Sequence, residues 1–220
     1  GQDGHVRVMD YLDEQRMCRL YEKFILEFYR RAYPQFSASA SKIDWQLDDD
    51  MGDLLPEMRS DITLTQGNRV LIIDAKYYAN ILQMQFDVPK IHSANLYQIF
   101  TYVKNKEAEL ASSPHEVSGM LLYAKTDEDL LPHRQYRMSG NRIAVQTLDL
   151  DCDFSEIAQQ LGTLTVTKLF VNFNDNQGHN HEKFYIITVL CFFIIRICSM
   201  HIFISQLKPI AIFGLIQYVV

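Results

Sequence analysis

The stretch that decides the fold runs from residue 60 to residue 76 and reads Ser60-Asp61-Ile62-Thr63-Leu64-Thr65-Gln66-Gly67-Asn68-Arg69-Val70-Leu71-Ile72-Ile73-Asp74-Ala75-Lys76. The Gly-Asn pair at its centre suits a two-residue type II′ turn between two strands, with glycine first. In such a hairpin Gln66 faces Arg69, and counting back along both strands places Asp61 opposite Asp74. Opposed Cβ atoms in an antiparallel pair lie about 4.5–5.5 Å apart. The sequence therefore predicts two adjacent carboxylates.

These carboxylates predict a metal site. Like charges placed directly opposite each other destabilise a sheet unless something compensates them. Mg²⁺ is commonly held by one or two carboxylates together with water and phosphate oxygens. Lys76 points to the same face as Asp74, where it could orient an attacking water or stabilise charge on a phosphate. An exposed hairpin with a solvated polar face is the alternative, although the apolar run from Val70 to Ile73 indicates a central strand.

Two predicted helices offer further polar groups. In a first helix, from about Met9 to Tyr33, Glu22 falls in the apolar arc, where a carboxylate needs a partner such as a metal or a lysine. The alternative is a rim residue that reaches solvent. A second helix runs from about Ser93, its expected cap, to Leu110. It carries Gln98 and Tyr102 on one face, where Gln98 could contact DNA or brace the lysine, or simply cap a core face.

The remaining pattern predicts the fold class. Further strands are expected over Ile43–Leu47, Met120–Lys125 and Ile143–Leu150, and a short helix over Ser155–Leu161. Helices before, between and after these strands favour an α/β protein with a mixed β-sheet flanked by helices. We expect residues 1–168 to form this domain.

Composition restricts the class of protein. The chain has 220 residues, 48% hydrophobic and 22% charged, which is typical of a soluble globular domain. Its net charge of −6 weighs against a broad basic surface for nucleic acid. Four cysteines without a CxxC pair predict neither disulfides nor a zinc site, so a reduced, cytoplasmic setting is expected. The chain begins with glycine and shows no signal segment, and we expect it to start inside a longer protein.

An apolar tail follows at residues 169–220. From Phe184 to Ile204 it is nearly continuously apolar, and a membrane span needs about 20 such residues. Arg196 lies near the middle of this run, where a charge costs roughly 2.5–3.5 kcal/mol. We therefore do not expect a membrane partner; buried strands, or an end that is not the protein's natural one, are the other interpretations.

Three strings of residues, in this order, resemble the McrC family of the PD-(D/E)XK nuclease superfamily: Leu20-Tyr21-Glu22-Lys23-Phe24, Ile72-Ile73-Asp74-Ala75-Lys76-Tyr77-Tyr78 and His92-Ser93-Ala94-Asn95-Leu96-Tyr97-Gln98. McrC is the endonuclease subunit of the McrBC modification-dependent restriction system. The resemblance implies a restriction-endonuclease-like core and Mg²⁺-dependent cleavage of DNA that contains methylated cytosine. It implies catalytic roles for Asp61, Asp74, Lys76 and Glu22, with the three carboxylates as metal ligands and with Gln98 and Tyr102 supporting the site.

The resemblance also implies a partner, an McrB-type AAA+ ring that hydrolyses GTP. No Walker motif occurs in this sequence, so GTP is expected to bind to the partner. The leading hypothesis is therefore a metal-dependent endonuclease subunit that acts on DNA with this ring. The alternative hypothesis is a catalytically inactive, truncated module that docks to the partner or to a membrane, suggested by the apolar tail and by the absence of the family's N-terminal portion.

Overall fold

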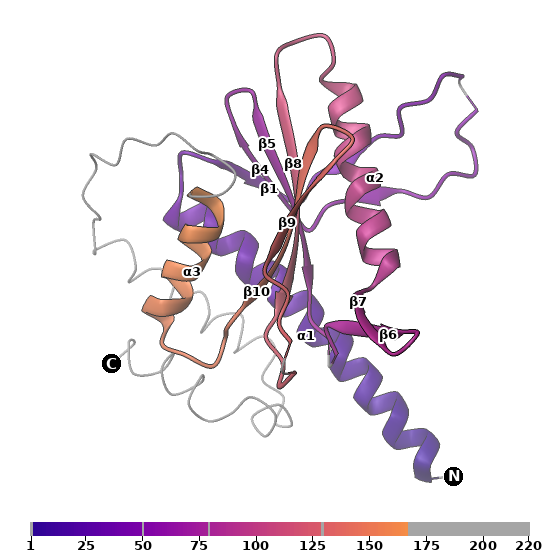
Figure 1. Cartoon of the computed structure of the whole chain (residues 1–220), viewed down its shortest axis with the longest axis vertical. Coiled ribbons are helices and arrows are strands. Elements are labelled where there is room, and N and C mark those ends of the chain that lie inside the picture. The colour runs from indigo at the N-terminus through magenta and orange to yellow at the C-terminus, as the bar shows by residue number, and fades with distance from the viewer. Residues whose placement is uncertain (1, 50, 79, 129, 167–220) are drawn as a thin grey trace. The chain divides into compact units, whose positions relative to one another are not determined.

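The computed structural model describes residues 2–49, 51–78, 80–128 and 130–166 (Figure 1). Its elements in chain order are α1 (Gln2–Ala32), β1 (Ser37–Ser39), β2 (Lys42–Ile43), β3 (Met58–Arg59), β4 (Ile62–Gln66), β5 (Arg69–Lys76), β6 (Leu82–Gln85), β7 (Val88–Ile91), α2 (Ser93–Glu109), β8 (Glu116–Ala124), β9 (Arg134–Met138), β10 (Asn141–Leu148) and α3 (Phe154–Val166). They fall into two compact units. The first comprises residues 1–26 and 35–147, and the described part of the second comprises residues 27–34 and 148–166.

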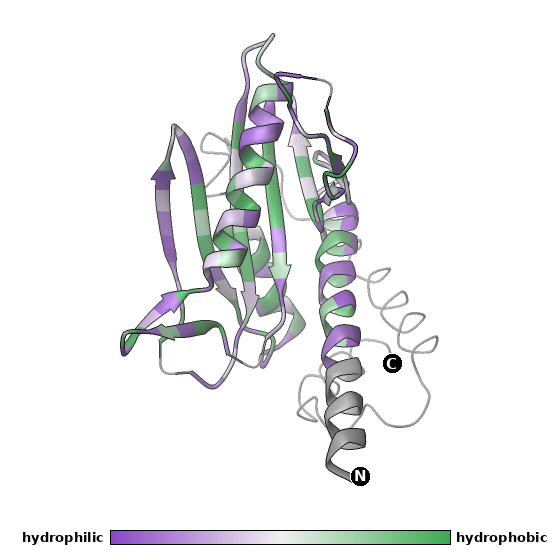
Figure 2. Cartoon of the chain, turned by 90° about the vertical axis from the view of Figure 1, so that its right-hand side faces the viewer, coloured by the Kyte–Doolittle hydropathy of each residue, from purple (hydrophilic) through white to green (hydrophobic). Residues whose placement is uncertain are grey.

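The first unit is built on a six-stranded sheet in the order β1-β4-β5-β8-β10-β9. The sheet is mixed, because β5 pairs antiparallel with β4 and parallel with β8. The strands in its middle are hydrophobic, whereas the edge strand β9 is hydrophilic and largely exposed (Figure 2). The predicted α/β class, with a mixed sheet flanked by helices and a PD-(D/E)XK-like core, is confirmed.

The β4–β5 hairpin has the predicted register. Gln66 pairs with Arg69, and the pairing continues to Ile62 opposite Ile73. Gly67 has a φ of 58°, the left-handed value that the first position of a type II′ turn requires. Every residue of β5 from position 70 to position 75 is buried, so the apolar run does form a central strand.

Helix α2 packs on one face of this sheet through its apolar side. Ile99 and Val103 join a buried cluster with Val70, Ile72 and other residues of β5, β8 and β10. A close approach at Gly119 of β8 permits this packing. A Cβ added at Gly119 would lie 2.8 Å from Ile99 Cγ1 and 2.9 Å from Val103 Cγ2. The helix that carries Gln98 is therefore held directly against the strand next to β5.

The described part of the second unit joins the last turn of α1 to α3. The buried Tyr29 hydroxyl donates to the Leu161 carbonyl at 3.1 Å and accepts from Thr165 Oγ1 at 2.6 Å. Gly162 of α3 leaves room for the Tyr33 hydroxyl, which would lie 2.3 Å from an added Cβ. Helix α3 begins one residue before the predicted helix and extends five residues beyond it.

Some local predictions were wrong. The strand expected over Ile43–Leu47 stops at Ile43, because the chain turns so that the Trp45 indole donates to the Pro56 carbonyl at 2.8 Å. The N-cap of α2 is His92, not Ser93, and it makes no side-chain capping bond. Strands β1, β3, β6, β7 and β9 were not predicted. The predicted apolar tail lies outside the described residues.

A search of the described residues finds no helix with both the length and the apolar character needed to cross a membrane.

Gly119→Ala tests the contact between α2 and β8. The added methyl group meets three side chains at 2.8–3.0 Å, and overpacking of this kind costs about 1–3 kcal/mol. We expect the melting temperature to fall by about 3–10 °C in a thermal unfolding experiment. Gly52→Ala is the control, because its added methyl meets only the half-exposed Leu47 side chain. Equal melting temperatures for wild type and Gly119→Ala would contradict the close packing.

Candidate active site

The candidate site lies at the end of β5. Asp74, the sixth residue of that strand, is only 1% exposed although it carries a carboxylate. Its Oδ2 atom lies 2.8 Å from Nζ of Lys76. This oxygen is buried and accepts no well-directed hydrogen bond within the described part of the chain. Asp74 therefore forms an ion pair and still keeps capacity to bind a further positive group.

Asp61 lies directly before β4, one residue beyond the Ile62–Ile73 pair that closes the hairpin ladder. Its Oδ2 atom accepts a hydrogen bond of 2.8 Å from the backbone N–H of Ala75, the neighbour of Asp74. The two aspartates thus meet at one end of the hairpin, as the turn geometry predicted. The prediction did not include the hydrogen bond by which Asp61 holds the start of β4 to the backbone of β5.

The two aspartates strongly influence each other's protonation. Burial raises the pKa of Asp61 to about 8, and the nearby negative charges of Asp74 and Glu22 add to the effect. Burial also raises the pKa of Asp74, although the ammonium group of Lys76 opposes part of that rise. Because a buried pair of carboxylates resists holding two negative charges, this site favours any cation that can share them.

Lys76 is the positive group of the site. Burial alone would lower its pKa, but the Asp74 and Asp61 carboxylates outweigh burial, so the pKa lies above its usual value. Lys76 Nζ also donates to Gln98 Oε1 at 3.2 Å, and Gln98 Nε2 donates to the Tyr102 hydroxyl at 2.9 Å. The predicted pair on α2 thus extends the row of polar contacts and holds the ammonium group from the helix side.

Glu22 approaches the site from α1. It is half-buried, and burial raises its pKa, with the Lys76 ammonium opposing and the Asp74 carboxylate adding to the rise. Two contacts to Tyr77, directly after β5, dock this part of α1. Cys18 Sγ donates to the Tyr77 carbonyl at 3.2 Å, and the Tyr21 and Tyr77 rings lie 6.2 Å apart. Glu22 therefore lies within electrostatic range of the aspartates.

A second polar group near the site was missed by the sequence reasoning. Asn95, buried near the start of α2, donates to the Tyr123 hydroxyl at 3.0 Å and accepts from the Tyr78 hydroxyl at 3.4 Å. The Tyr123 side chain lies within electrostatic range of Asp74 and Lys76. Burial raises the pKa of the Tyr123 hydroxyl to about 12. The Tyr-Tyr and Asn-Leu-Tyr-Gln strings were visible in sequence, but their mutual bonding required the fold.

The donor set suits a hard divalent cation. Across the described ranges, no three His, Cys, Asp or Glu side chains lie close enough together to hold a metal ion. Mg²⁺, however, commonly uses only one or two carboxylates and fills its remaining positions with water and phosphate oxygens. Asp61 and Asp74 could supply those two carboxylates, because they meet at one end of the hairpin and Asp74 Oδ2 is buried with an ion pair to Lys76 but no well-directed hydrogen bond. Glu22 could join them only through water or a side-chain movement.

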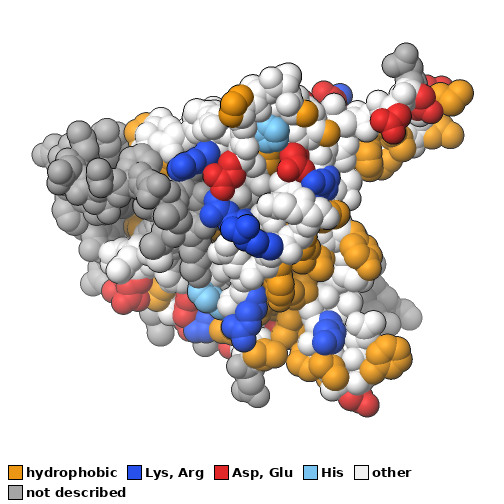
Figure 3. Space-filling view, turned by 45° about the horizontal axis from the view of Figure 1, so that its top comes forward, with side chains coloured by type: hydrophobic (Ala, Val, Ile, Leu, Met, Phe, Trp, Pro, Cys, Tyr) orange, Lys and Arg blue, Asp and Glu red, His pale blue; other side chains and the backbone are white. Residues whose placement is uncertain are grey.

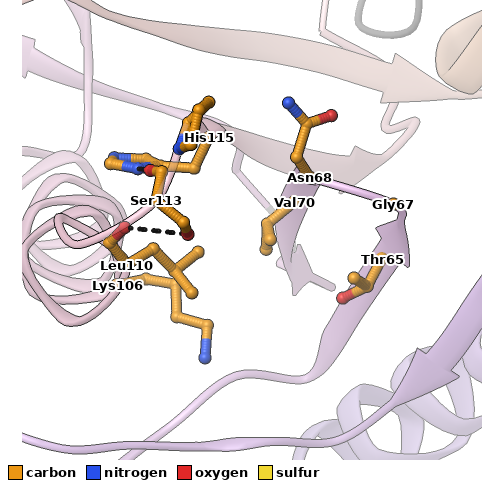
Figure 4. Close-up of a pocket in the computed structure, with 9 residues that line it drawn as sticks. Thr65, Gly67, Asn68, Val70, Lys106, Leu110, Ser113 and His115 are labelled. Atoms are coloured by element: carbon orange, nitrogen blue, oxygen red, sulfur yellow. Dashed lines mark hydrogen bonds between the residues drawn. The ribbon is translucent and has the colours of Figure 1, made fainter.

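A pocket of about 360 Å³ lies elsewhere (Figure 4). It is lined by Gly67, Asn68 and Val70 at the turn end of the β4–β5 hairpin, and by Lys106 and Leu110 at the last turn of α2. Asp74 and Lys76 lie at the opposite end of β5. The pocket therefore belongs to a different part of the sheet and is separate from the carboxylate site.

Comparison with known proteins finds a relative in Escherichia coli. Over 162 residues, which are 72% of this chain, the sequence is 34% identical to the Escherichia coli (strain K12) protein named Type IV methyl-directed restriction enzyme EcoKMcrBC. The matched region covers 45% of that protein, so the chain spans less than half of its relative. No protein-family model matches the chain.

Asp61→Asn tests whether the pKa of Asp61 is raised in the folded protein. The folded protein keeps a proton on Asp61 up to a pKa of about 8, whereas the unfolded chain releases it near pH 4. The folded state therefore binds more protons between these values, and wild-type stability falls as pH rises through this window. We expect Asp61→Asn to melt at the wild-type temperature near pH 4.

At pH 8 the variant should melt about 2–4 °C or more above wild type, in line with roughly 1 kcal/mol of relieved repulsion. The measurement is thermal unfolding without divalent cations at several pH values. Asp53→Asn serves as control, because Asp53 is an exposed carboxylate. A pH-independent difference between Asp61→Asn and wild type would contradict the raised pKa.

Proposed function

We propose that this chain, which is McrC-like over 162 residues, carries the DNA-cleaving site of a restriction enzyme. The observation that carries the proposal is the pairing of the buried Asp74 and the partly buried Asp61 with Lys76 at one end of β5. Cleavage of a phosphodiester requires a bound water, a means to neutralise the phosphate and a donor for the developing charge. The site offers groups for each of these tasks.

In this proposal Asp61 and Asp74 hold Mg²⁺, with Glu22 as the third carboxylate. When bound, the cation neutralises the scissile phosphate and lowers the pKa of a water. Asp61 loses its proton as the cation binds, because the positive charge removes the repulsion that raised its pKa. Asp74 is held by the backbone of β5 and by its ion pair with Lys76, so its carboxylate is oriented before the substrate arrives.

Lys76 acts as a donor and not as a general base. Its pKa lies above the usual value, so the ammonium group stays protonated at neutral pH. It can donate a hydrogen bond to the attacking water or to a phosphate oxygen, where negative charge develops. Gln98 restricts the ammonium group to this position, and Tyr102 in turn restricts the amide of Gln98. Both α2 residues are positioning residues.

The relative supports a proposal for the substrate and the partner. The name of the Escherichia coli protein describes a methyl-directed restriction enzyme, and we extend this to DNA that contains methylated cytosine. The sequence has no Walker motif, so an McrB-type AAA+ ring would bind and hydrolyse GTP. In this arrangement the partner selects the DNA, and this chain cuts it. The competing function is a catalytically inactive module that docks to the partner. A wild-type chain that neither binds the metal nor supports cleavage would favour this alternative.

Asp74→Asn tests the proposal. Replacing this carboxylate removes the most buried ligand, and we expect DNA cleavage with Mg²⁺, GTP and the partner ring to fall at least about a hundredfold. Calorimetry on the chain should show that Mn²⁺ binding is lost in the same variant. Asp53→Asn, at an exposed position, should cleave and bind Mn²⁺ as wild type does. Undiminished cleavage by Asp74→Asn would overturn the assignment of the site.

Gln98→Met tests the positioning of Lys76. Methionine keeps the length of the side chain but removes the oxygen that accepts from Lys76. We expect roughly tenfold slower cleavage with unchanged Mn²⁺ affinity, since a freely rotating ammonium group stabilises the reaction less well. Tyr102→Phe removes only the next bond in the row and should have a smaller effect. A simple loss of folding would instead lower the melting temperature and metal affinity together.

A further inference from the structure

A short two-stranded ribbon connects the two elements that hold Lys76. β6 and β7 pair antiparallel outside the six-stranded sheet. The chain runs from Lys76 at the end of β5 into this ribbon, and from the ribbon into α2, which carries Gln98. In Figure 1 the ribbon lies beside the start of α2. Anything bound at the end of β5 would therefore lie next to the ribbon.

The base of the ribbon is firmly held. Leu82 and Ile91 face each other in the register and pack against the buried cluster under α2. The ring of His92 lies 5.6 Å from the ring of Tyr78, and its Nε2 atom lies 3.3 Å from the Asn80 carbonyl oxygen. Because Tyr78 also bonds to α2 through Asn95, the ribbon has a fixed root at the edge of the site.

The tip of the ribbon is apolar and exposed. Phe86 is 91% exposed, and its neighbours Met84 and Val88 are 68% and 46% exposed. Phe86 and Asp87 form the turn with φ values of 51° and 57°. Two left-handed residues in succession favour Asn-Gly, and a bulky aromatic side chain is unfavourable there. Neither burial in the described structure nor turn geometry therefore accounts for a phenylalanine at this position.

One face of the ribbon is polar. Gln83 pairs with Lys90, and Gln85 pairs with Val88, so the two amides and the ammonium group lie on the same side. Lys90 and Gln85 are exposed. Amide and ammonium groups are the donors that proteins use toward base edges and phosphates. The ribbon thus combines an apolar tip with hydrogen-bonding groups along one face. Figure 3 shows one face of the molecule, on which hydrophobic side chains are exposed beside Lys and Arg side chains.

We infer that the β6–β7 ribbon enters a groove of the DNA duplex beside the cleavage site, with Phe86 against the bases and Lys90 against a phosphate. This inference rests on the proposed function, because DNA is the occupant only if the site cuts it. The major groove admits a two-stranded ribbon, and apolar side chains serve as wedges against base steps. A protein partner is the other class of occupant, and the experiment separates the two.

The test uses a double variant, Phe86→Asn with Asp87→Gly. Asn-Gly is the preferred pair for a turn with two left-handed residues, so the ribbon keeps its fold while it loses its aromatic tip. Loss of the Asp87 carboxylate alone would strengthen binding to DNA, so weaker binding reports the loss of the Phe86 ring. The affinity of the full chain for a duplex of about 30 base pairs, which is about three helical turns, is measured with Ca²⁺ so that no cleavage occurs. We expect at least about tenfold weaker binding and a melting temperature equal to or above wild type.

Leu54→Asn is the matched control, because Leu54 is 98% exposed in a different loop and its loss should leave DNA affinity unchanged. Lys90→Gln gives an independent measurement, since loss of one phosphate contact should reduce the slope of log affinity against log salt by about 1. An unchanged affinity in the double variant overturns the inference. The inference is also overturned if the double variant binds DNA as wild type does but no longer binds the partner ring, because the tip would then contact a protein.

The proposed function has a separate readout in Asp74-dependent cleavage. Tight DNA binding that depends on Phe86, without any cleavage, would contradict the nuclease function and support the role of the ribbon in DNA binding. Cleavage by wild type, together with unchanged DNA affinity in the double variant, would contradict the role of the ribbon and support the nuclease function. A wild-type chain that binds no duplex rejects the ribbon, whatever the cleavage assay with the partner shows.

Discussion

The burial of Asp74 beside Asp61 is the constraint on which the rest of the first unit depends. A carboxylate that is 1% exposed at the end of an apolar strand is costly, and a second carboxylate nearby adds repulsion. Lys76 offsets part of this charge from two residues along the same strand. The other elements then bring partners to this point: β4 brings Asp61, α2 brings Gln98 and α1 brings Glu22.

The central part of this arrangement could be predicted because its determinants are local. The turn at Gly67 fixes the register of the hairpin, and strand alternation fixes which side chains share a face. The same holds for Gln98 and Tyr102, which are one helical turn apart. The spacing of two residues along a strand or helix indicates whether they share a face, but it does not indicate which hydrogen bonds they make. The bond from Ala75 to Asp61 and the Asn95 contacts therefore became visible only in the fold.

The missed elements are those without a repeating apolar pattern. β1 and β9 are short edge strands, and β9 is polar at nearly every position, so nothing in the sequence separates them from loops. The β6–β7 turn was missed because Phe86-Asp87 carries none of the usual Gly or Asn signals. The position of Glu22 depends on how α1 docks on Tyr77. Such long-range contacts cannot be read from helical periodicity.

The acidic composition is compatible with DNA as substrate once the charges are placed. A net charge of −6 weakens long-range attraction, but affinity close to the site depends on local groups. A divalent cation held by Asp61 and Asp74 would reverse the sign of the potential where the phosphate arrives. In the inferred complex, the apolar tip of the β6–β7 ribbon adds a contact with the DNA bases that does not depend on charge. Since these two sources act at the site itself, the proposed function would assign long-range DNA capture to a partner and the carboxylates to the metal.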